Sequence, residues 1–239
     1  NFEINESELN NLVFQIGMIE LISYWKAACS PEVIIEAGSL NQEQVEWWKK
    51  LYYNGLGEFF YRNGIHARKD DFMSLSTNGK NTFQKFEFDQ SDSFLVPVGG
   101  GKDSVVTLET LVGGRKDVRP FILNPGKAGI DTVGNVGFSE EDILTVDRTI
   151  DPVLLKLNAQ GFLNGHTPFS ALLAFISLLA ARLAGIKNIA LSNESSANEP
   201  TVPGTEVNHQ YSKSFEFERG FRDYVAKPSL SNVLGQLTR

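Results

Sequence analysis

A short stretch near the middle of the chain constrains the fold more than any other feature. Phe94–Val98 is a run of apolar strand-forming residues, and three glycines follow it at positions 99–101. From Ser104 to Val112 apolar residues recur at helical spacing, which predicts a helix. Glycines let backbone amides approach a ligand closely, and the amides and dipole of a helix N-terminus face the same spot. The turn is therefore a candidate anion site.

Two side chains in this turn indicate what the anion is. Lys102 adds a full positive charge. Asp103 would repel a bare phosphate, but it fits if it holds a magnesium ion that the phosphates also bind. The glycine spacing matches neither a Walker-type loop nor a dinucleotide fingerprint. An ordinary glycine-rich turn is the alternative, but packing gives no reason for Lys-Asp-Ser to follow three glycines.

Residues 99–104 resemble the PP-loop of the ATP pyrophosphatase superfamily, Ser-Gly-Gly-x-Asp-Ser, with Gly99 in place of the first serine. Members of that superfamily cleave ATP between its α and β phosphates. The resemblance implies ATP and Mg²⁺ as cofactors, with Asp103 at the metal and Lys102 and Asp103 in catalysis. The residues assigned to ATP in this turn are Gly99, Gly100, Gly101, Lys102 and Ser104.

The second half of the chain alternates predicted strands and helices. Further strands are expected at 118–123, 143–146 and 187–191, and helices after Asp151-Pro152 and Thr167-Pro168, while residues 126–142 are expected to form a loop. This order predicts an α/β fold with a parallel sheet of Rossmann-like type. The PP-loop resemblance implies the HUP (adenine nucleotide alpha hydrolase) variety of that fold. Ligands of such sheets lie beyond the carboxyl ends of the strands, where Asn124 and residues 192–194 are also expected.

The first 90 residues are expected to form an α+β accessory unit, and residues 91–239 the nucleotide-binding domain. Capping boxes at Asn5 and Asn41 predict two helices. Asn78-Gly79, between strand-like runs at 72–76 and 82–88, predicts a β-hairpin. Aromatic residues gather between positions 47 and 61 and could line a ligand groove, but such a stripe is more often core. They are Trp47, Trp48, Tyr52, Tyr53, Phe59, Phe60 and Tyr61.

Polar and titratable residues gather after the last predicted strand. His209, Tyr211 and Lys213 are three proton-transfer candidates within five residues, and in a strand all three would point to one face. A solvated loop and edge strand is the alternative. His166 opens a predicted helix that should point at the same edge, as a ligand or as a structural residue.

Four segments together resemble one family. Residues 96–104, 164–168, 191–197 and 207–214 are similar to the ATP-dependent UDP-N-acetylmuramoyl-L-alanyl-L-glutamate epimerases. The resemblance implies inversion of the terminal L-glutamate of a UDP-sugar dipeptide, with release of AMP and pyrophosphate. Members are expected to be longer than this chain. The resemblance also assigns four residues to the ATP site: Asn124, His166, Asn193 and Glu194. Glu194 is assigned to the metal as well. Catalysis is assigned to His209, Tyr211 and Lys213.

Adenylation gives a physical reason for a PP-loop in an epimerase. One general base supplies about 10²–10⁴-fold, too little to remove the α-proton beside an ionised carboxylate. Transfer of AMP removes that negative charge, and the carbanion can then delocalise as an enolate. Racemisation by two thiols is excluded, because the chain has one cysteine, Cys29. Two alternatives stay open. One is another PP-loop enzyme, such as an amide ligase or a tRNA-modifying thiolase, and the other is an ATP-binding module without turnover.

The net charge and the hydropathy of the chain limit the kinds of partner it is expected to bind. A net charge of −7 argues against a nucleic-acid partner held by a broad basic surface. The most apolar segments fall short of the roughly 20 residues that a membrane span needs. We expect no signal peptide, and the single cysteine favours a reducing cytoplasm. The sequence gives no prediction of the oligomeric state.

Overall fold

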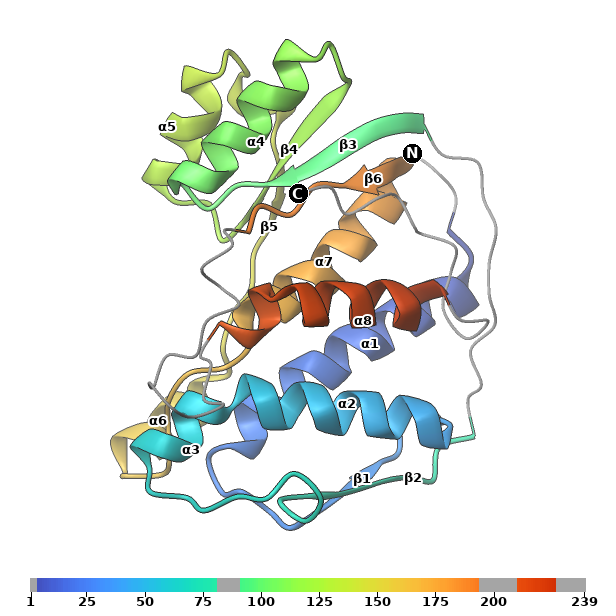
Figure 1. The fold of residues 1–239 in the computed structure, drawn as a ribbon, viewed down its shortest axis with the longest axis vertical. Helices are drawn as coiled ribbons and strands as arrows, with labels where there is room; N and C mark the ends of the chain where they lie inside the picture. Colours follow the sequence, from blue (N-terminus) through green and yellow to red (C-terminus); the bar gives the residue numbers. More distant parts are fainter. Residues whose placement is uncertain (1–3, 81–90, 194–209, 227–239) are drawn as a thin grey trace.

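The computed structural model describes residues 4–80, 91–193 and 210–226. A parallel sheet with helices on both faces occupies one end of an elongated molecule, and a mainly helical layer occupies the other (Figure 1). The predicted α/β fold of Rossmann-like type is confirmed.

The sheet has the order β5-β4-β3-β6, and each neighbouring pair is parallel. Its strands are β3 (Ser91–Pro97), β4 (Val118–Leu123), β5 (Leu144–Val146) and β6 (Ile186–Ile189). From β3 the chain winds outward through β4 to β5 and then returns to place β6 on the other side of β3. The carboxyl ends of β3 and β6 therefore form the topological switch point, where open α/β sheets bind their ligands.

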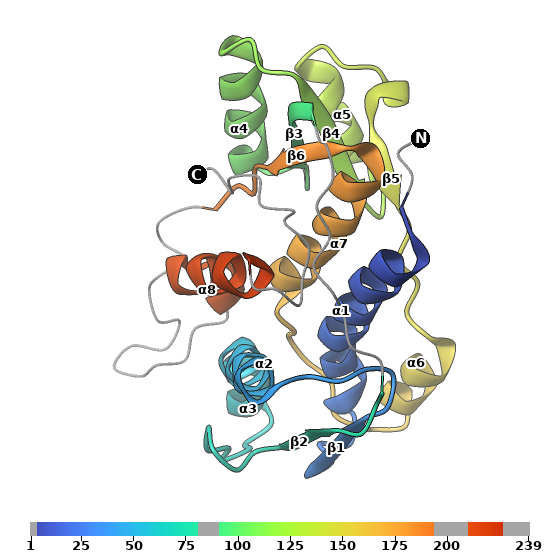
Figure 2. The same ribbon diagram turned by 90° about the vertical axis from the view of Figure 1, so that its right-hand side faces the viewer.

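Alternating side chains of β3 reach the two faces of the sheet. Phe94 and Val96 join a small core cluster, and Leu95 joins the large one. The helices α4 (Lys102–Gly113) and α5 (Lys127–Asn135) cover the first face, and α7 (Phe169–Ala184) covers the second (Figures 1 and 2). The sheet is thus shielded on both sides, and its carboxyl edge is left for a site.

The helical layer contains α1 (Glu6–Trp25), α2 (Gln42–Gly55), α3 (Gly57–Arg62) and α8 (Phe215–Ala226). Both predicted N-caps are confirmed. The side chain of Asn5 accepts from the Glu8 amide at 2.8 Å, and Asn41 makes both halves of a capping box with Gln44. Smaller elements complete the fold: β1 (Glu32–Ile35), β2 (Ser74–Thr77), α6 (Pro152–Ala159) and the 3₁₀ helices η1 (Glu140–Asp142) and η3 (Tyr211–Lys213).

One continuous core joins the two ends of the molecule. Trp48 of α2 stacks on Phe175 of α7 with ring centroids 5.1 Å apart, and its indole N–H donates to the Tyr224 hydroxyl of α8 at 2.8 Å. Most of the aromatic residues between positions 47 and 61 therefore belong to the core, as predicted. Tyr61, by contrast, is 65% exposed. The domain boundary near residue 90 lies outside the described residues and stays a prediction.

Two expectations about secondary structure are wrong in part, and the predicted hairpin stays a prediction. The strand β2 pairs in parallel with β1, and the second arm of the expected hairpin, residues 82–88, lies outside the described part of the chain. Residues 126–142 contain the helix α5. Pro168 is the N-cap of α7 and not its first helical residue, so Thr167-Pro168 does not repeat the cap that Asp151 gives to α6.

Within the described residues, no helix is both long enough and apolar enough to cross a membrane.

Candidate active site

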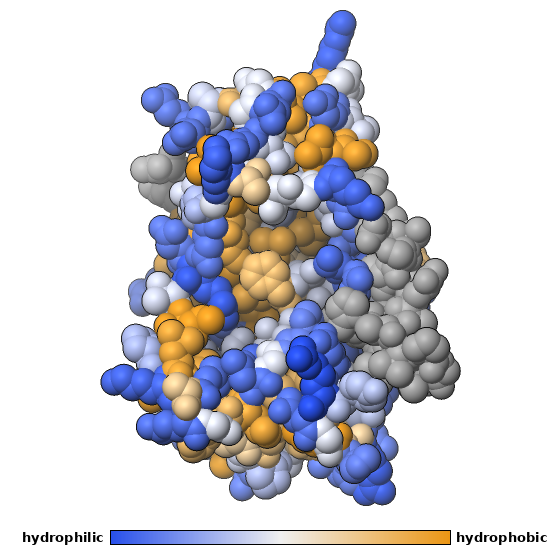
Figure 3. Space-filling view, turned by 90° about the vertical axis from the view of Figure 1, so that its left-hand side faces the viewer, coloured by the Kyte–Doolittle hydropathy of each residue, from blue (hydrophilic) through white to orange (hydrophobic). Residues whose placement is uncertain are grey.

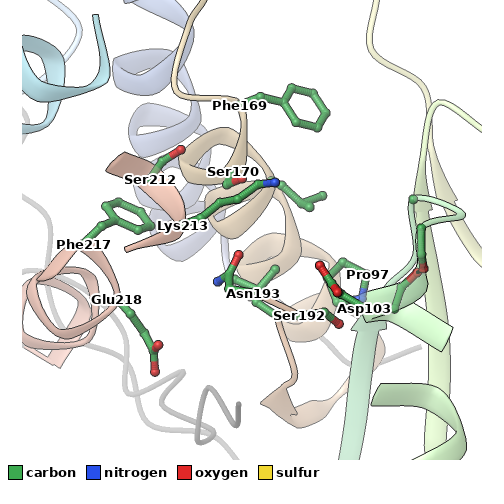
Figure 4. A pocket seen from close by; sticks show the side chains of 15 residues that line it. Pro97, Asp103, Phe169, Ser170, Ser192, Asn193, Ser212, Lys213, Phe217 and Glu218 are labelled. Atoms are coloured by element: carbon green, nitrogen blue, oxygen red, sulfur yellow. Dashed lines mark hydrogen bonds between the residues drawn. The ribbon is translucent and has the colours of Figure 1, made fainter. Parts of the chain in front are cut away.

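A pocket of about 240 Å³ opens at the switch point, and we call it the switch-point pocket. Its wall combines the end of β3, the glycine turn, the first turns of α4 and α7, the end of β6, and parts of η3 and α8. The lining residues are Pro97, Gly99, Gly101, Asp103, Ser104, Phe169, Ser170, Leu173, Leu191, Ser192, Asn193, Ser212, Lys213, Phe217 and Glu218. Figure 4 shows Lys213 and Glu218 approaching from one side and Asp103 from the other.

The glycine turn has the geometry that close approach to an anion requires. Gly101 is the N-cap of α4, and as a glycine it has no side chain that could cap the helix. A Cβ added to Gly99 or Gly101 would meet nothing within 4 Å. Gly100 has φ +84°, and a Cβ there would lie 2.8 Å from the Ala128 carbonyl carbon. The turn thus lets a ligand approach the N-terminus of α4 closely, as in phosphate-binding helix ends.

Asp103 fits a magnesium site of the kind that nucleotides bring with them. Its carboxylate lines the pocket in the first turn of α4. Mg²⁺ beside a nucleotide is usually held by one or two carboxylates, with phosphates and waters as the other ligands. In the described residues no group of three histidine, cysteine or acidic side chains could hold a metal alone. The donor set therefore suits an ion shared with phosphates.

Tyr211 and Lys213 do not share a face, contrary to the prediction for a strand. They lie in the 3₁₀ helix η3, and Lys213 lines the switch-point pocket. Tyr211 turns toward α2, where it lies beside the side chain of Asn54, and its ring packs edge-on against Phe217. Burial raises the pKa of Tyr211, which keeps its hydroxyl protonated at neutral pH. Of the two candidates that the structure describes, Lys213 is thus the one that reaches the pocket.

Other predicted residues lie outside the pocket wall. Lys102 is exposed at the start of α4. Asn124 follows β4 at the correct edge, but its side chain accepts from the Arg148 amide at 2.6 Å. The Nδ1 atom of His166 lies 4.0 Å from a carboxylate oxygen of Glu58, away from the glycine turn. Glu194 and His209 lie outside the described residues. Six predicted residues do line the pocket: Gly99, Gly101, Asp103, Ser104, Asn193 and Lys213.

Sequence reasoning missed the apolar wall of the pocket. Phe169, Leu173 and Phe217 lie in the helices α7 and α8. The hydrophobic pattern of these helices does not distinguish pocket residues from core residues. Phe169 is 49% exposed at the first residue of α7, but this exposure appears only in the structure. Figure 3 shows a hollow midway along one face of the molecule, with apolar surface inside it.

Replacing Gly100 by alanine tests the turn directly. The positive φ and the contact with Ala128 predict a loss of stability of about 1–3 kcal/mol. Gly99→Ala is the matched control for stability, since its Cβ enters open space and its φ is not in the left-handed region. Urea denaturation of both variants provides the measurement. Equal stability in the two variants would contradict this geometry.

Together, the fold and the pocket define the class: a Rossmann-like α/β protein with a ligand pocket at its switch point. The MurL N-terminal domain family matches residues 2–233, and the chain belongs to that family.

The chain is also similar to three curated proteins, each named UDP-N-acetyl-alpha-D-muramoyl-L-alanyl-L-glutamate epimerase. One, from Xanthomonas oryzae pv. oryzae, is 34% identical over 236 residues, which cover 93% of this chain and 49% of the relative. Those from Micromonospora sp. and Salinispora tropica are each 35% identical, covering 92% and 88% of this chain and 48% and 45% of the relatives. The chain thus spans about half the length of the curated relatives it matches. No solved structure matches it.

Proposed function

We propose that the full-length protein is an ATP-dependent epimerase of the terminal L-glutamate of UDP-N-acetylmuramoyl-L-alanyl-L-glutamate, acting in peptidoglycan precursor synthesis. The names of the three relatives support the substrate and the overall reaction. The observation that carries the mechanism is the glycine turn, with Asp103 beside it, opening onto the switch-point pocket. A cytoplasmic location follows from this proposal, because nucleotide-linked precursors and ATP are both cytoplasmic.

ATP is assigned to the glycine turn, as in the PP-loop enzymes that the turn resembles. The amides of residues 99–104 and the dipole of α4 would hold its phosphates. Asp103 would bind Mg²⁺, which neutralises phosphate charge and so assists attack at phosphorus. Gly99 stands where the PP-loop pattern has serine, so phosphate binding at this position relies on the backbone.

The first chemical step joins the substrate to AMP. An oxygen of the glutamate α-carboxylate attacks the α-phosphorus, the bond from that phosphorus to the bridging oxygen breaks, and pyrophosphate leaves. The resulting acyl-adenylate has no carboxylate charge next to the α-carbon. A base then removes the α-proton, an acid returns a proton to the other face, and water cleaves the acyl-adenylate to carboxylate and AMP.

Lys213 is assigned to one proton transfer, because its side chain enters the pocket opposite Asp103 (Figure 4). Tyr211 acts at most through Lys213, since it faces α2. His209 remains a candidate for the second transfer, and Glu194 for the metal; both lie outside the described residues. His166 and Asn124 are proposed to shape the edge of the site and not to contact ATP, given their contacts with Glu58 and Arg148.

Exchange of the α-proton with solvent tests this function. The full-length protein is incubated in D₂O with the UDP-muramoyl dipeptide and ATP·Mg²⁺, and the terminal glutamate is followed by proton NMR. We expect loss of the α-proton signal that requires ATP and proceeds together with AMP formation. Exchange without ATP would contradict adenylation. AMP formation without exchange would favour another PP-loop activity, and ATP binding without pyrophosphate release would favour a module without turnover.

A further inference from the structure

The switch-point pocket is too small for the whole proposed substrate. Its volume of about 240 Å³ lies below the roughly 300–1,000 Å³ that is usual for pockets holding drug-sized ligands. It suits the reacting phosphates and a carboxyl group. The uridine end of a sugar nucleotide must therefore lie outside this pocket, and this inference rests on the proposed function.

A second cavity of about 550 Å³ lies where α2 meets α3 and the loop after it, and we call it the aromatic pocket. Its lining residues are Tyr53, Asn54, Gly57, Phe60, Tyr61, Gly64, Ile65, His66 and Ala67. Nothing in the catalytic assignment uses these residues. The first five belong to the aromatic-rich stretch between positions 47 and 61. For that stretch the sequence left two interpretations open, a ligand groove and a core.

The wall of the aromatic pocket is fixed before any ligand binds. The rings of Tyr53 and Phe60 pack with centroids 6.0 Å apart. The Ile65 amide donates to the Phe60 carbonyl at 2.9 Å, and the Tyr53 hydroxyl donates to the Ala67 carbonyl at 3.4 Å. These bonds hold the loop after α3 against α2. A preformed site loses less entropy when a ligand binds than a site that must be ordered.

The chemistry of this wall suits a neutral flat ring. Among the described residues that line it, none is a carboxylate, a lysine or an arginine. The Tyr61 ring is 65% exposed and offers a stacking face, while Asn54 and His66 bring polar groups to the edge. Nucleobases combine a π-face with a hydrogen-bonding edge, and stacking on an aromatic side chain is their usual mode of binding. Two other cavities carry acidic groups instead, with Glu43 in one and Asp131 in the other.

The two pockets meet near one pair of residues. Asn54 lines the aromatic pocket, and its side chain lies beside Tyr211. The next two residues after Tyr211, Ser212 and Lys213, line the switch-point pocket. A wall residue of the aromatic pocket thus lies beside the 3₁₀ helix η3, which supplies two wall residues of the switch-point pocket. A substrate with a nucleotide at one end and a glutamate at the other suits two neighbouring pockets of this kind.

We infer that the aromatic pocket binds the uracil ring of the sugar nucleotide, with Tyr61 as the stacking platform and Asn54 as a hydrogen-bonding partner of the base. The inference adds a substrate subsite in α2 and α3, a part of the chain that the PP-loop resemblance does not cover. It also makes the N-terminal helices part of the active site.

The test is calorimetric titration of the full-length protein with uridine 5′-monophosphate. Wild type is expected to bind it, and Tyr61→Ala is expected to weaken binding about tenfold or more, as loss of base stacking does. Tyr24→Ala is the matched control, because Tyr24 is an exposed tyrosine of α1 that lines neither pocket. Tyr61→Phe keeps the stacking face and should restore binding.

Two further titrations separate this subsite from the proposed function. Tyr61→Ala should leave ATP binding unchanged, and inorganic phosphate should not compete with uridine monophosphate. Unchanged affinity for uridine monophosphate in Tyr61→Ala, or an equal loss in Tyr24→Ala, would overturn the subsite even if ATP cleavage proceeds normally. If uridine monophosphate binds through Tyr61 but no AMP forms from ATP, the subsite stands and the adenylation proposal fails.

Discussion

Replacing Asp103 by alanine is expected to lower ATP-dependent pyrophosphate release on the order of 10²–10³-fold, the usual loss when one group that stabilises transition-state charge is removed. The Asp103 carboxylate lines the switch-point pocket in the first turn of α4, beside the amides assigned to phosphate. Without it, Mg²⁺ loses its assigned protein ligand, and the charge that develops on the leaving pyrophosphate is less well neutralised. The measurement is pyrophosphate release with ATP and the UDP-muramoyl dipeptide.

Glu109→Ala is the matched control for Asp103→Ala. Glu109 is an exposed acidic residue of the same helix that does not line the pocket, so its loss changes the net charge equally. The control should keep the wild-type rate. A full rate of pyrophosphate release in Asp103→Ala would remove the metal role from this residue, and an equal loss in both variants would show that charge alone is responsible.

The second large effect is expected at the buried ion pair between Arg182 and Glu8. The guanidinium of α7 donates to the carboxylate of α1 through two bonds of 2.5 and 2.9 Å, and both side chains are almost fully buried. Arg182→Met leaves the Glu8 charge buried, which typically costs about 3–5 kcal/mol. Because α1 packs along α7, whose first turn lines the switch-point pocket, the loss should also reduce ligand binding.

Chemical denaturation measures this loss, and two variants control it. Arg62→Ala removes an exposed ion pair with Glu58 and should change stability by less than about 0.5 kcal/mol. The double variant Glu8→Gln with Arg182→Met removes the stranded charge and should recover part of the loss. If Arg182→Met is as stable as Arg62→Ala, the pair does not hold α1 against α7.

Local signals in the sequence were enough to predict the elements on either side of the glycine turn. The apolar run before the glycines became β3, and the helix after them became α4, with Gly101 as its N-cap. Gly185 ends α7 in the left-handed conformation that a C-terminal glycine predicts. At these positions the secondary-structure propensity, the hydrophobic periodicity and the capping residues all indicate the same element. Residues close together in the sequence are then enough to determine the local structure.

The helix α5 shows why other elements were not predicted. Gly129 and Gly134 lower its helix propensity, and the stretch was therefore expected to be a loop. Tertiary contact explains one of these glycines, since a Cβ at position 129 would lie 3.2 Å from the Ile122 Cδ1 atom of β4. The residue is small because the helix approaches the sheet closely, and that requirement appears only once the fold is known.

The site was predicted well near the glycine turn and poorly elsewhere. Residues 99–104 are close in sequence, so their geometry follows from one turn. Lys213, Phe169 and Phe217 reach the pocket from η3, α7 and α8, and only packing brings these elements together. Tyr211 lies two residues from Lys213 but faces the opposite way, because a 3₁₀ helix has replaced the expected strand. Spacing predicts a shared face only when the secondary structure is right.

The most direct test of the central claim is a crystal structure of the full-length protein with Mg²⁺ and an ATP analogue that cannot be cleaved between the α and β phosphates. We expect the phosphates on the amides of residues 99–104, with the metal between them and the Asp103 carboxylate. An empty glycine turn, with the analogue bound at another surface, would contradict ATP binding at this turn.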